Sequence, residues 1–450
     1  MSLPKGWIKT ELQVVGKIVT GKTPSKNNSE FYGGKRLLVK PGDLDKDIIV
    51  TSSVDRLSDK GLDNAPSIPF GSVMVTCIGN MGKVGIAGET LATNQQINSI
   101  VPNKNLIDSK YLYYYAKTLK EWMDQESSAT TIAIINKSKF STAPLLLPPI
   151  NEQKRIAKKL DELLASVENI KTRLDIIPTI IKRFRQSILA AATSGKLTEK
   201  WRSVHIGFEN PRTMVEKAEA KKTNKVKVRK SNNLEDIVNE IELPKTWEII
   251  ENYRLAKDGN NSICAGPFGT IFKAKDFRDE GVPIIFLRHI GEAEYLTKKP
   301  TFMDIKVWKE KHQPYSVYGG ELLVSKLGDP PGTACIYPLN IGTAMVTPDV
   351  MKMSVDNTLV PTEYLMYFFN SPTCKNMIRE LAFGVTRLRI DLTMFKSFPI
   401  PLPPREEQKE IVSQVEFLFT LADSLEIKIE AAKKRGDKLT QSILHKAFKG

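Results

Sequence analysis

The stretch that decides the fold is Leu146–Ile156, which reads LLPPINEQKRI. It returns as PLPPREEQKEI at Pro401–Ile411, 255 residues further along the chain. At the same separation, RQSIL at 185–189 returns as TQSIL at 440–444. Two motifs that recur in one register, with no gap between them, indicate a shared segment that occurs twice.

The same register extends upstream of the shared segment, because Phe140 matches Phe395. A shorter repeated motif lies near the start of each half of the chain, as LPKGW at 3–7 and LPKTW at 243–247. The chain is therefore a tandem duplication, in which a variable segment is followed by a shared segment and the pair then occurs a second time.

Each shared segment places apolar residues at alternating spacings of four and three, which is the pattern of a coiled coil. In the first copy this predicted seam consists of Ile156, Leu160, Leu163, Val167, Ile170 and Leu174. In the second copy it consists of Ile411, Val415, Leu418, Leu425 and Ile429. The period of 3.5 residues predicts a left-handed supercoil.

Two matched seams predict two long helices that pair with each other, antiparallel and with internal pseudo-twofold symmetry. A long amphipathic helix packed on a globular core is the alternative interpretation. Pro178 and Gly436 are expected to kink or break the helices, because proline removes an i→i−4 hydrogen bond and glycine weakens a helix.

The variable segments have mixed patterns. Apolar runs such as 73–79 and 321–328 predict short strands, and the stretches that start at 111 and 364 predict helices. The expected fold class is α+β, with two mixed α/β domains separated by two long helices that form an antiparallel coiled coil. The expected boundaries are 1–146 for the first domain, 147–200 for the central helical spacer, 201–241 for a basic, solvated linker, 242–401 for the second domain and 402–450 for the C-terminal helix.

The composition indicates a polyanionic partner. The chain of 450 residues has a formal net charge of +15 and a pI near 9.4, which favours nucleic acid as the partner. The four cysteines and four histidines are scattered without C-x-x-C spacing, which argues against a metal centre or a disulfide framework and suits a reducing cytoplasm. No apolar run approaches the roughly 20 residues that span a bilayer. We therefore expect a cytoplasmic protein that has no metal site and does not bind a membrane.

The stretch LLLPPINEQKRIAKKLDELLASVENIKTRL…RFRQSILAAATSGKLTEKWR closely resembles the specificity (S) subunits of type I restriction–modification systems. The resemblance covers the whole architecture and is most specific in 147–202 and in PLPPREEQKEI…TQSIL. It implies that each variable domain is a target recognition domain for half of a split DNA sequence. One departure is that the first repeat continues as KLTEKWR, whereas the sequence stops at Gly450, where the second copy would continue.

The resemblance also implies which subunits bind this chain and that catalysis belongs to them. The chain is expected to be a non-catalytic DNA-recognition subunit that binds double-stranded DNA and two methyltransferase subunits. Two restriction subunits with ATP-driven translocase and nuclease activity would join that core. No cofactor is expected on this chain, and S-adenosylmethionine, ATP and Mg²⁺ are expected in the partner subunits.

Two motifs suggest catalysis, but neither suits its chemistry. GKIVTGKT at 16–23 matches the P-loop pattern, yet a P-loop needs a helix directly after its glycine-rich turn. Here Ile18 and Val19 predict a strand, and Pro24 opens a loop. DPPG at 329–332 resembles the [DNS]-P-P-[aromatic] loop of amino-methyltransferases, but Gly332 cannot stack on a flipped base.

DNA contacts are expected on loops of the variable domains. Lysine and arginine neutralise phosphates, whereas arginine, asparagine and glutamine distinguish base edges in the major groove. In the first domain the candidates are Lys22, Lys26, Arg36, Lys83, Asn94, Gln95 and Gln96. In the second domain they are Lys273, Arg288, Lys326, Arg387 and Arg389. For each residue the alternative is a solvated surface charge, and the asparagine–glutamine run could equally be structural.

Two further functions are open from the sequence. One is a self-contained methyltransferase or nucleotide hydrolase, which the motifs at 329–332 and 16–23 suggest. The other is a coiled-coil adaptor for RNA or protein. Binding of S-adenosylmethionine or hydrolysis of ATP by the chain alone would favour the first, and sequence-specific duplex binding would argue against the second.

Overall fold

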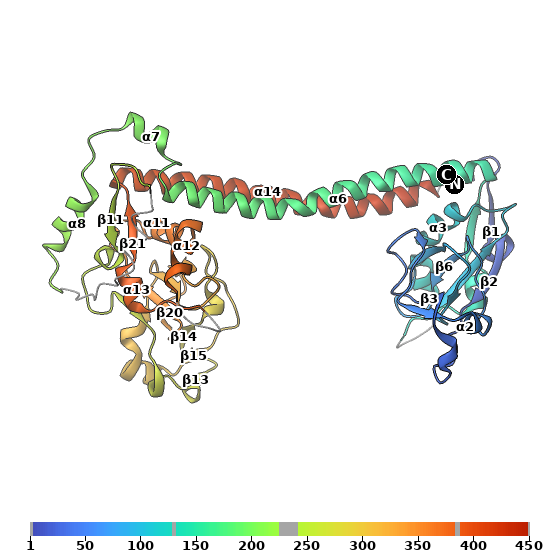
Figure 1. The fold of residues 1–450 in the computed structure, drawn as a ribbon, viewed down its shortest axis with the longest axis horizontal. Coiled ribbons are helices and arrows are strands. Elements are labelled where there is room, and N and C mark those ends of the chain that lie inside the picture. Colours follow the sequence, from blue (N-terminus) through green and yellow to red (C-terminus); the bar gives the residue numbers. More distant parts are fainter. Residues whose placement is uncertain (1–2, 128–131, 225–241, 383–387, 449–450) are drawn as a thin grey trace. The chain divides into compact units, whose positions relative to one another are not determined.

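The computed structural model describes residues 3–127, 132–224, 242–382 and 388–448. The chain divides into two compact units. Unit 1 comprises residues 1–176 and 429–450, and unit 2 comprises residues 177–428. Each unit contains one mixed α/β domain together with one stretch of each long helix (Figure 1).

Unit 1 is built from short strands and short helices before its long helix. Its strands are β1 (Ile8–Glu11), β2 (Gly16–Thr20), β3 (Tyr32–Val39), β4 (Ile49–Val50), β5 (Asp55–Leu57), β6 (Val73–Thr76), β7 (Val84–Ala87), β8 (Ala92–Thr93), β9 (Ile97–Pro102) and β10 (Pro144–Leu147). Its helices are α1 (Leu12–Val15), α2 (Asp59–Asp63), α3 (Ser109–Thr118), α4 (Lys120–Glu126), α5 (Lys137–Ser141) and the first part of α6 (Ile150–Thr193).

The main sheet of unit 1 has the strand order β2-β9-β6-β7-β4 and lies between two apolar cores. Val73 and Val75 of β6 belong to the same core cluster as Tyr111 of α3. Met74, between them, belongs to the cluster that contains Leu37 of β3. Because successive side chains of a strand point to opposite faces, an uninterrupted apolar run such as VMVT is suited to a sheet that is covered on both sides.

Unit 2 contains a second domain of the same kind. Its strands are β11 (Glu248–Glu251), β12 (Ile263–Ala265), β13 (Phe277–Arg278), β14 (Val282–Ile285), β15 (Phe302–Met303), β16 (Ser316–Val317), β17 (Leu322–Ser325), β18 (Ala334–Ile336), β19 (Ala344–Val346), β20 (Val350–Met353) and β21 (Pro399–Leu402). Its helices are α7 (Glu199–Val204), α8 (Pro211–Glu219), α10 (Ile305–Val307), α11 (Thr362–Asn370), α12 (Pro372–Leu381), α13 (Leu392–Ser397) and the first part of α14 (Arg405–Ala447).

The two domains share one topology. The order β12-β20-β17-β18 in unit 2 repeats β2-β9-β6-β7 in unit 1, with antiparallel pairing throughout. The parallel pair β14–β19 likewise repeats β3–β8. The predicted strands at 73–79 and 321–328 are confirmed as β6 and β17, and the predicted helices as α3 and α11. The duplication therefore includes the variable segments, although their sequences have diverged.

The strand pair that closes each domain keeps the same register in both copies. β1 pairs with β10, with Ile8 opposite Leu147, and β11 pairs with β21, with Glu248 opposite Leu402. These are the positions that LPKGW/LPKTW and the repeated PP motif set in the sequence. The motifs therefore attach each domain to its long helix in the same way.

The repeated glutamine of the shared motif holds the start of each long helix. The side-chain amide of Gln153 donates to the carbonyl of Pro148, and that of Gln408 donates to the carbonyl of Pro403, both at 2.8 Å. Both glutamines are fully buried. Because a buried amide without partners is costly, these bonds fix the direction in which each helix leaves its domain.

The two long helices lie side by side and run antiparallel, as predicted (Figure 1). In unit 1, Lys171 pairs with Asp437 at 2.6 Å and Asp175 pairs with Lys433 at 2.5 Å, so residue numbers rise on one helix as they fall on the other. In unit 2, Arg185 of α6 pairs with Asp423 of α14 at 2.5 Å.

Neither helix is broken at its weak position. α6 is continuous through Pro178, and α14 is continuous through Gly436, so the expectation of a break is wrong. Proline removes only one backbone hydrogen bond, and packing against the partner helix maintains the rest. A Cβ at Gly436 would lie 3.4 Å from Cε of Lys171, so the lysine stem crosses α14 where a glycine leaves room for it.

The predicted seam of α6 is confirmed at four of its six positions and wrong at Leu163 and Ile170. Leu160 and Val167 are buried and Leu174 is half-buried, but Leu163 and Ile170 are 38% and 55% exposed. The remaining predicted member, Ile156, is half-buried. The inward positions are instead those one residue later, at 157, 164 and 171.

The difference between the predicted and the observed seam of α6 has a physical cause. The apolar residues of α6 occupy three neighbouring positions around the helix. The heptad period alone therefore did not decide which of these positions face α14, and two choices, or phases, were open. The structure adopts the phase that buries Ala157 and lays the stems of Lys171 and Arg185 across the pair. Their charged ends then reach acidic residues of α14, whereas a leucine or phenylalanine there would gain only apolar contact.

In α14 the predicted seam holds along its first part. Ile411 and Val415 are fully buried, and Leu418 and Ile429 are half-buried. Leu425 is 42% exposed, so its assignment to the seam is wrong. It is the repeat counterpart of Ile170, and both residues occupy the same flank of the seam.

Residues 201–224 are not the solvated linker that their charge predicts. Val215 of α8 is fully buried in the core of unit 2. Arg212 donates to Glu248 of β11 at 3.1 Å, and Arg254 donates to Glu219 at 2.6 Å. The charged residues of this segment have partners on the domain surface, which a count of charges cannot reveal. The remainder of the predicted linker, 225–241, lies outside the described residues.

Candidate nucleic-acid interface

Four loops meet at one edge of the main sheet in unit 1, and we call them the unit 1 reading edge: residues 21–26, 77–82, 93–96 and 132–136. The amide of Cys77 donates to the carbonyl of Gln96 at 2.8 Å, and the amide of Ile135 donates to the carbonyl of Cys77 at 2.9 Å. The hydroxyl of Thr23 bonds the side chain of Gln95 at 3.1 Å. Backbone and side-chain bonds thus gather segments that are far apart in the sequence.

The equivalent loops of unit 2 form the unit 2 reading edge: residues 266–273, 326–332, 347–350 and 388–391. The amide of Lys326 donates to the carbonyl of Asp349 at 2.8 Å, and the amide of Ile390 donates to the carbonyl of Lys326 at 3.0 Å. Isolated bridges Ile78–Ile134 and Leu327–Arg389 tie matching loops in the two units. The two edges therefore have the same construction.

One glycine in each edge is required by close approach. A Cβ at Gly21 would lie 2.3 Å from the carbonyl oxygen of Asn94, and one at Gly266 would lie 2.2 Å from that of Val346. Backbone atoms cannot give way at such distances. These glycines serve loop packing, and for Gly21 this explains the apparent P-loop: β2 is a strand, and a loop rather than a helix follows Thr23.

Three of the lysine and glutamine candidates of unit 1 lie exposed at the edge of the sheet. Lys22, Lys26 and Gln95 are exposed on the unit 1 reading edge. Asn94 is 6% exposed, and its side chain bonds both the side chain and the amide of Gln96, at 2.9 and 3.2 Å. Asn94 therefore braces the loop, and Gln95 is the exposed member of this run, with its side-chain oxygen accepting from the hydroxyl of Thr23.

Two candidates of unit 1 have protein partners instead. The guanidinium of Arg36 donates to Asp59 at 2.7 Å, and this hydrogen bond raises the pKa of Arg36. The ammonium of Lys83 donates to the carbonyl of Pro41 at 3.3 Å. The sequence could not separate these two from the other lysines and arginines, because their partners come from distant segments.

In unit 2 the structure brings Lys326 and Arg389 to one edge. The ammonium of Lys326 lies 4.5 Å from the centroid of the Phe268 ring, and partial burial lowers the pKa of this lysine. Arg389 is exposed on the neighbouring loop. Arg387, the other arginine of GVTRLRI, lies outside the described residues.

The other two candidates of unit 2 differ. Lys273 is exposed at the end of the 266–273 loop. The guanidinium of Arg288 lies 4.1 Å from the centroid of the Phe286 ring and donates to the hydroxyl of Thr301 at 3.1 Å. Arg288 thus packs on its own domain surface, against Phe286 and Thr301.

Sequence reasoning missed Phe268, which is 62% exposed at the unit 2 reading edge. An exposed aromatic ring beside a lysine is a surface on which a base can stack. The signal was present in the sequence, since GPFG at 266–269 matches the position of GKTP at 21–24 once the glycines are aligned. It could be recognised only after the two sheets had been superimposed strand by strand.

Neither motif that suggested catalysis has the local structure that its pattern calls for. In DPPG, Gly332 has a φ of +86°, which favours glycine, and a Cβ there would lie 2.4 Å from Cδ1 of Ile378. Among the described residues, no group of three or more histidine, cysteine or acidic side chains could hold a metal ion.

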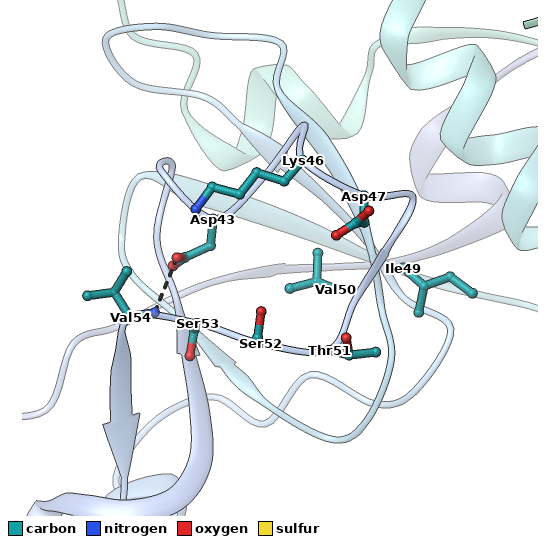
Figure 2. A pocket seen from close by; sticks show the side chains of 9 residues that line it. All are labelled: Asp43, Lys46, Asp47, Ile49, Val50, Thr51, Ser52, Ser53 and Val54. Carbon is teal, nitrogen blue, oxygen red and sulfur yellow. Dashed lines mark hydrogen bonds between the residues drawn. The ribbon is translucent and has the colours of Figure 1, made fainter. Parts of the chain in front are cut away.

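Figure 2 shows a pocket of about 210 Å³ in unit 1, lined by Asp43, Lys46 and residues 49–54. The carboxylate of Asp43 accepts from the amide of Val54 at 3.3 Å and from that of Lys40 at 2.9 Å. Backbone amides thus bond both carboxylate oxygens, which braces the loop around the pocket.

No helix in the described part of the chain is long and apolar enough to cross a membrane. The chain is 29% identical over 382 residues to the type I restriction enzyme EcoBI specificity subunit of Escherichia coli, covering 82% of this chain and 72% of that protein. It is 27% identical over 467 residues to the EcoKI specificity subunit of Escherichia coli (strain K12), covering 100% of this chain and 89% of that protein.

Solved structures share the fold. A chain from a structural study of complex assembly and conformational transition of the type I restriction–modification system superimposes with a TM-score of 0.64, at 16% identity, covering 100% of this chain and 99% of that one. The HsdS subunit from Thermoanaerobacter tengcongensis gives 0.60 at 15% identity, covering 100% and 98%. The family model for the type I restriction modification DNA specificity domain matches residues 4–179 and 266–434, once in each half of the duplication, and the chain therefore belongs to this family.

Proposed function

We propose that the chain reads a bipartite DNA target, with one half-site for the reading edge of each unit, and scaffolds methyltransferase and restriction subunits. The observation that carries the proposal is the pair of matched loop clusters, which have the same construction but different exposed side chains. The unit 1 reading edge presents Lys22, Lys26 and Gln95, and the unit 2 reading edge presents Arg389 and Phe268 beside the half-buried Lys326. Two loop clusters that share one backbone construction but carry different side chains are suited to contacting different bases.

The net charge supports double-stranded DNA as the ligand. A formal charge of +15 favours a polyanion, and the exposure of Lys22, Lys26 and Lys273 supports contacts with phosphates. Gln95 can pair with adenine through its amide, and Arg389 can pair with guanine. Catalysis is proposed to belong to partner subunits in the cytoplasm, which would supply S-adenosylmethionine, ATP and Mg²⁺.

The long helices present two apolar patches that support the binding of two methyltransferase subunits. The unit 1 patch consists of Leu163, Ile170 and Leu439, which are 38%, 55% and 49% exposed. Each of these residues comes one position before a residue that faces the partner helix. In an antiparallel pair, the residues at this position on the two helices lie on the same side of the pair. A patch of this kind on a soluble protein marks an interaction surface.

The unit 2 patch is the repeat counterpart of the first. It consists of Leu425 and Phe184, the counterparts of Ile170 and Leu439, whereas Leu418, the counterpart of Leu163, is half-buried against the core of unit 2. Phe184 and Leu425 are 39% and 42% exposed. Two equivalent apolar patches, one in each unit, support two copies of one helical partner.

The variant Ile170→Asp is expected to reduce bound methyltransferase from two copies to one, without changing the melting temperature by more than about 2 °C, because an exposed substitution costs little stability. The double variant Ile170→Asp with Leu425→Asp is expected to bind no copy. Native mass spectrometry of the purified complex gives the stoichiometry. Two copies retained on the double variant would show that the partner docks elsewhere.

Removing both lysines of the first loop, Lys22→Ala with Lys26→Ala, is expected to weaken target binding and to reduce the slope of log K against log salt by about 2. Fluorescence titrations of the assembled complex on its target duplex, over a series of salt concentrations, measure the slope. Arg36→Ala is the matched control, because its guanidinium is bonded to Asp59. An equal loss in the control would argue against a localised reading edge.

The function itself is tested by mapping methylated bases in cells that hold the partner methyltransferase with and without this chain. We expect a split motif of two short half-sites that is methylated only when the chain is present. Exchanging residues 1–146 for those of a relative should change one half of the motif and leave the other. A motif that does not depend on the chain would contradict the proposal.

A further inference from the structure

Two isoleucines on the unit 1 reading edge are exposed. Ile132 and Ile134 are 56% and 39% exposed, whereas the next residue, Ile135, is 1% exposed and belongs to the core of unit 1. Residues two apart in an extended segment lie on the same face. A single apolar residue on a surface needs no explanation, but a pair on one face of a loop cluster that carries lysines does.

The backbone holds Ile134 in a defined place. The carbonyl of Ala133 accepts from the amide of Gly79 at 2.9 Å, and the amide of Ile135 donates to the carbonyl of Cys77 at 2.9 Å. The residue between them forms an isolated β-bridge with the same loop. The exposed side chain is therefore carried by a segment that is bonded on both sides of it, which is the kind of support that a precise contact needs.

Arg389 occupies the equivalent place in unit 2, 255 residues further along the chain. The amide of Ile390 donates to the carbonyl of Lys326 at 3.0 Å, and the amide of Gly328 donates to the carbonyl of Leu388 at 3.4 Å. These two bonds repeat the pair that holds the segment in unit 1. One backbone position thus carries an aliphatic side chain in the first domain and a guanidinium in the second.

The two side chains suit different bases. Isoleucine cannot neutralise a phosphate or form a hydrogen bond with a base edge, so its favourable contacts on DNA are with apolar groups. The major groove presents one such group, the C5-methyl of thymine. Arginine, in contrast, pairs with O6 and N7 of guanine.

We propose that Ile134, supported by Ile132, reads a thymine methyl group in the half-site of unit 1, at the backbone position where unit 2 carries Arg389. This inference rests on the proposed function and names the chemistry of one base pair within it. The half-site of unit 1 then contains a T·A pair whose methyl group packs on Ile134. The contact removes apolar surface of both the base and the side chain from water, which favours it.

Replacing each thymine of the target duplex in turn by deoxyuridine removes only the C5-methyl group. We expect one replacement in the unit 1 half-site to weaken binding by the assembled complex about fourfold, which corresponds to about 0.8 kcal/mol for one methyl group. Ile134→Ala should bind the natural duplex about fourfold more weakly and should lose its sensitivity to that replacement. Fluorescence titrations measure both affinities. The salt slope should stay unchanged in this variant, because no phosphate contact is lost.

Ile8→Ala is the matched control, because Ile8 is 56% exposed on β1, in the strand pair that closes the domain. This variant should keep the full effect of deoxyuridine. A natural complex that binds its split target equally well with every deoxyuridine would overturn the inference and leave the proposed function standing, as would equal deoxyuridine effects in the natural and Ile134→Ala complexes. A complex without a split target would contradict the proposed function and this inference with it.

Ile134→Arg gives unit 1 the side chain that unit 2 has at this position. We expect the methylated motif in cells to require guanine in place of that thymine, with the other half-site unchanged. A first half-site that stays the same would argue against the inference. Loss of a methyltransferase subunit from the Ile134→Ala complex, seen by native mass spectrometry, would assign the two isoleucines to a protein interface and also overturn it.

Discussion

Leu160→Asp is expected to lower the free energy of unfolding of unit 1 by about 3–5 kcal/mol, the cost of an uncompensated buried charge. Leu160 is 2% exposed and belongs to the same core cluster as Ala157, Tyr111 and Phe448. The surroundings are apolar, so the new carboxylate gains no basic partner there. The variant therefore loses both the leucine packing and the association of α6 with α14 in this unit.

Urea unfolding followed by circular dichroism, with amide exchange to assign the loss to unit 1, measures the effect. Leu163→Asp is the matched control, three residues away and 38% exposed, and should cost less than about 1 kcal/mol. An equal loss at both positions would mean that the helices pair in the phase predicted from the sequence rather than in the phase of the structure. The control variant should still lose partner binding at the unit 1 patch.

Glu407→Ala is expected to cost unit 2 about 3–5 kcal/mol, because it leaves a largely buried arginine without its counter-charge. Arg202 is 18% exposed and loses its ion pair, and the buried groups of Thr198 and Trp247 lose their acceptor. A buried donor without a partner adds its own desolvation cost. The variant also frees the segment that joins α6 to the second domain.

The duplication provides the control for this prediction. Glu152→Ala removes the equivalent carboxylate in unit 1, where the side chain is 30% exposed and is bonded by Trp7 and by an exposed arginine. Its cost should stay near 1 kcal/mol, since exposed ion pairs contribute little. Thermal unfolding of both variants gives the comparison. Equal losses would show that the segment around Arg202 does not stabilise unit 2.

The reading edges show where sequence patterns stop being informative. Lys22 and Lys26 were candidates because they are basic residues in expected loops, and both are exposed on the unit 1 reading edge. Arg36 and Lys83 satisfied the same criterion, yet they bond Asp59 and Pro41. A sequence pattern gives the type of each residue. Whether its side chain is already bonded within the protein depends on neighbours that are distant in the chain.

The duplication and the two long antiparallel helices follow from the amino-acid sequence alone, because they depend on repeated motifs and on a sustained heptad. The tertiary structure decided the phase of the helix pair, because two neighbouring apolar positions satisfied the same period and only the ion pairs of Lys171 and Arg185 with α14 distinguish them. It also decided which copy of a repeated glutamate is buried. Glu152 and Glu407 lie in the same motif, and the difference between them is a segment that packs against one and not the other.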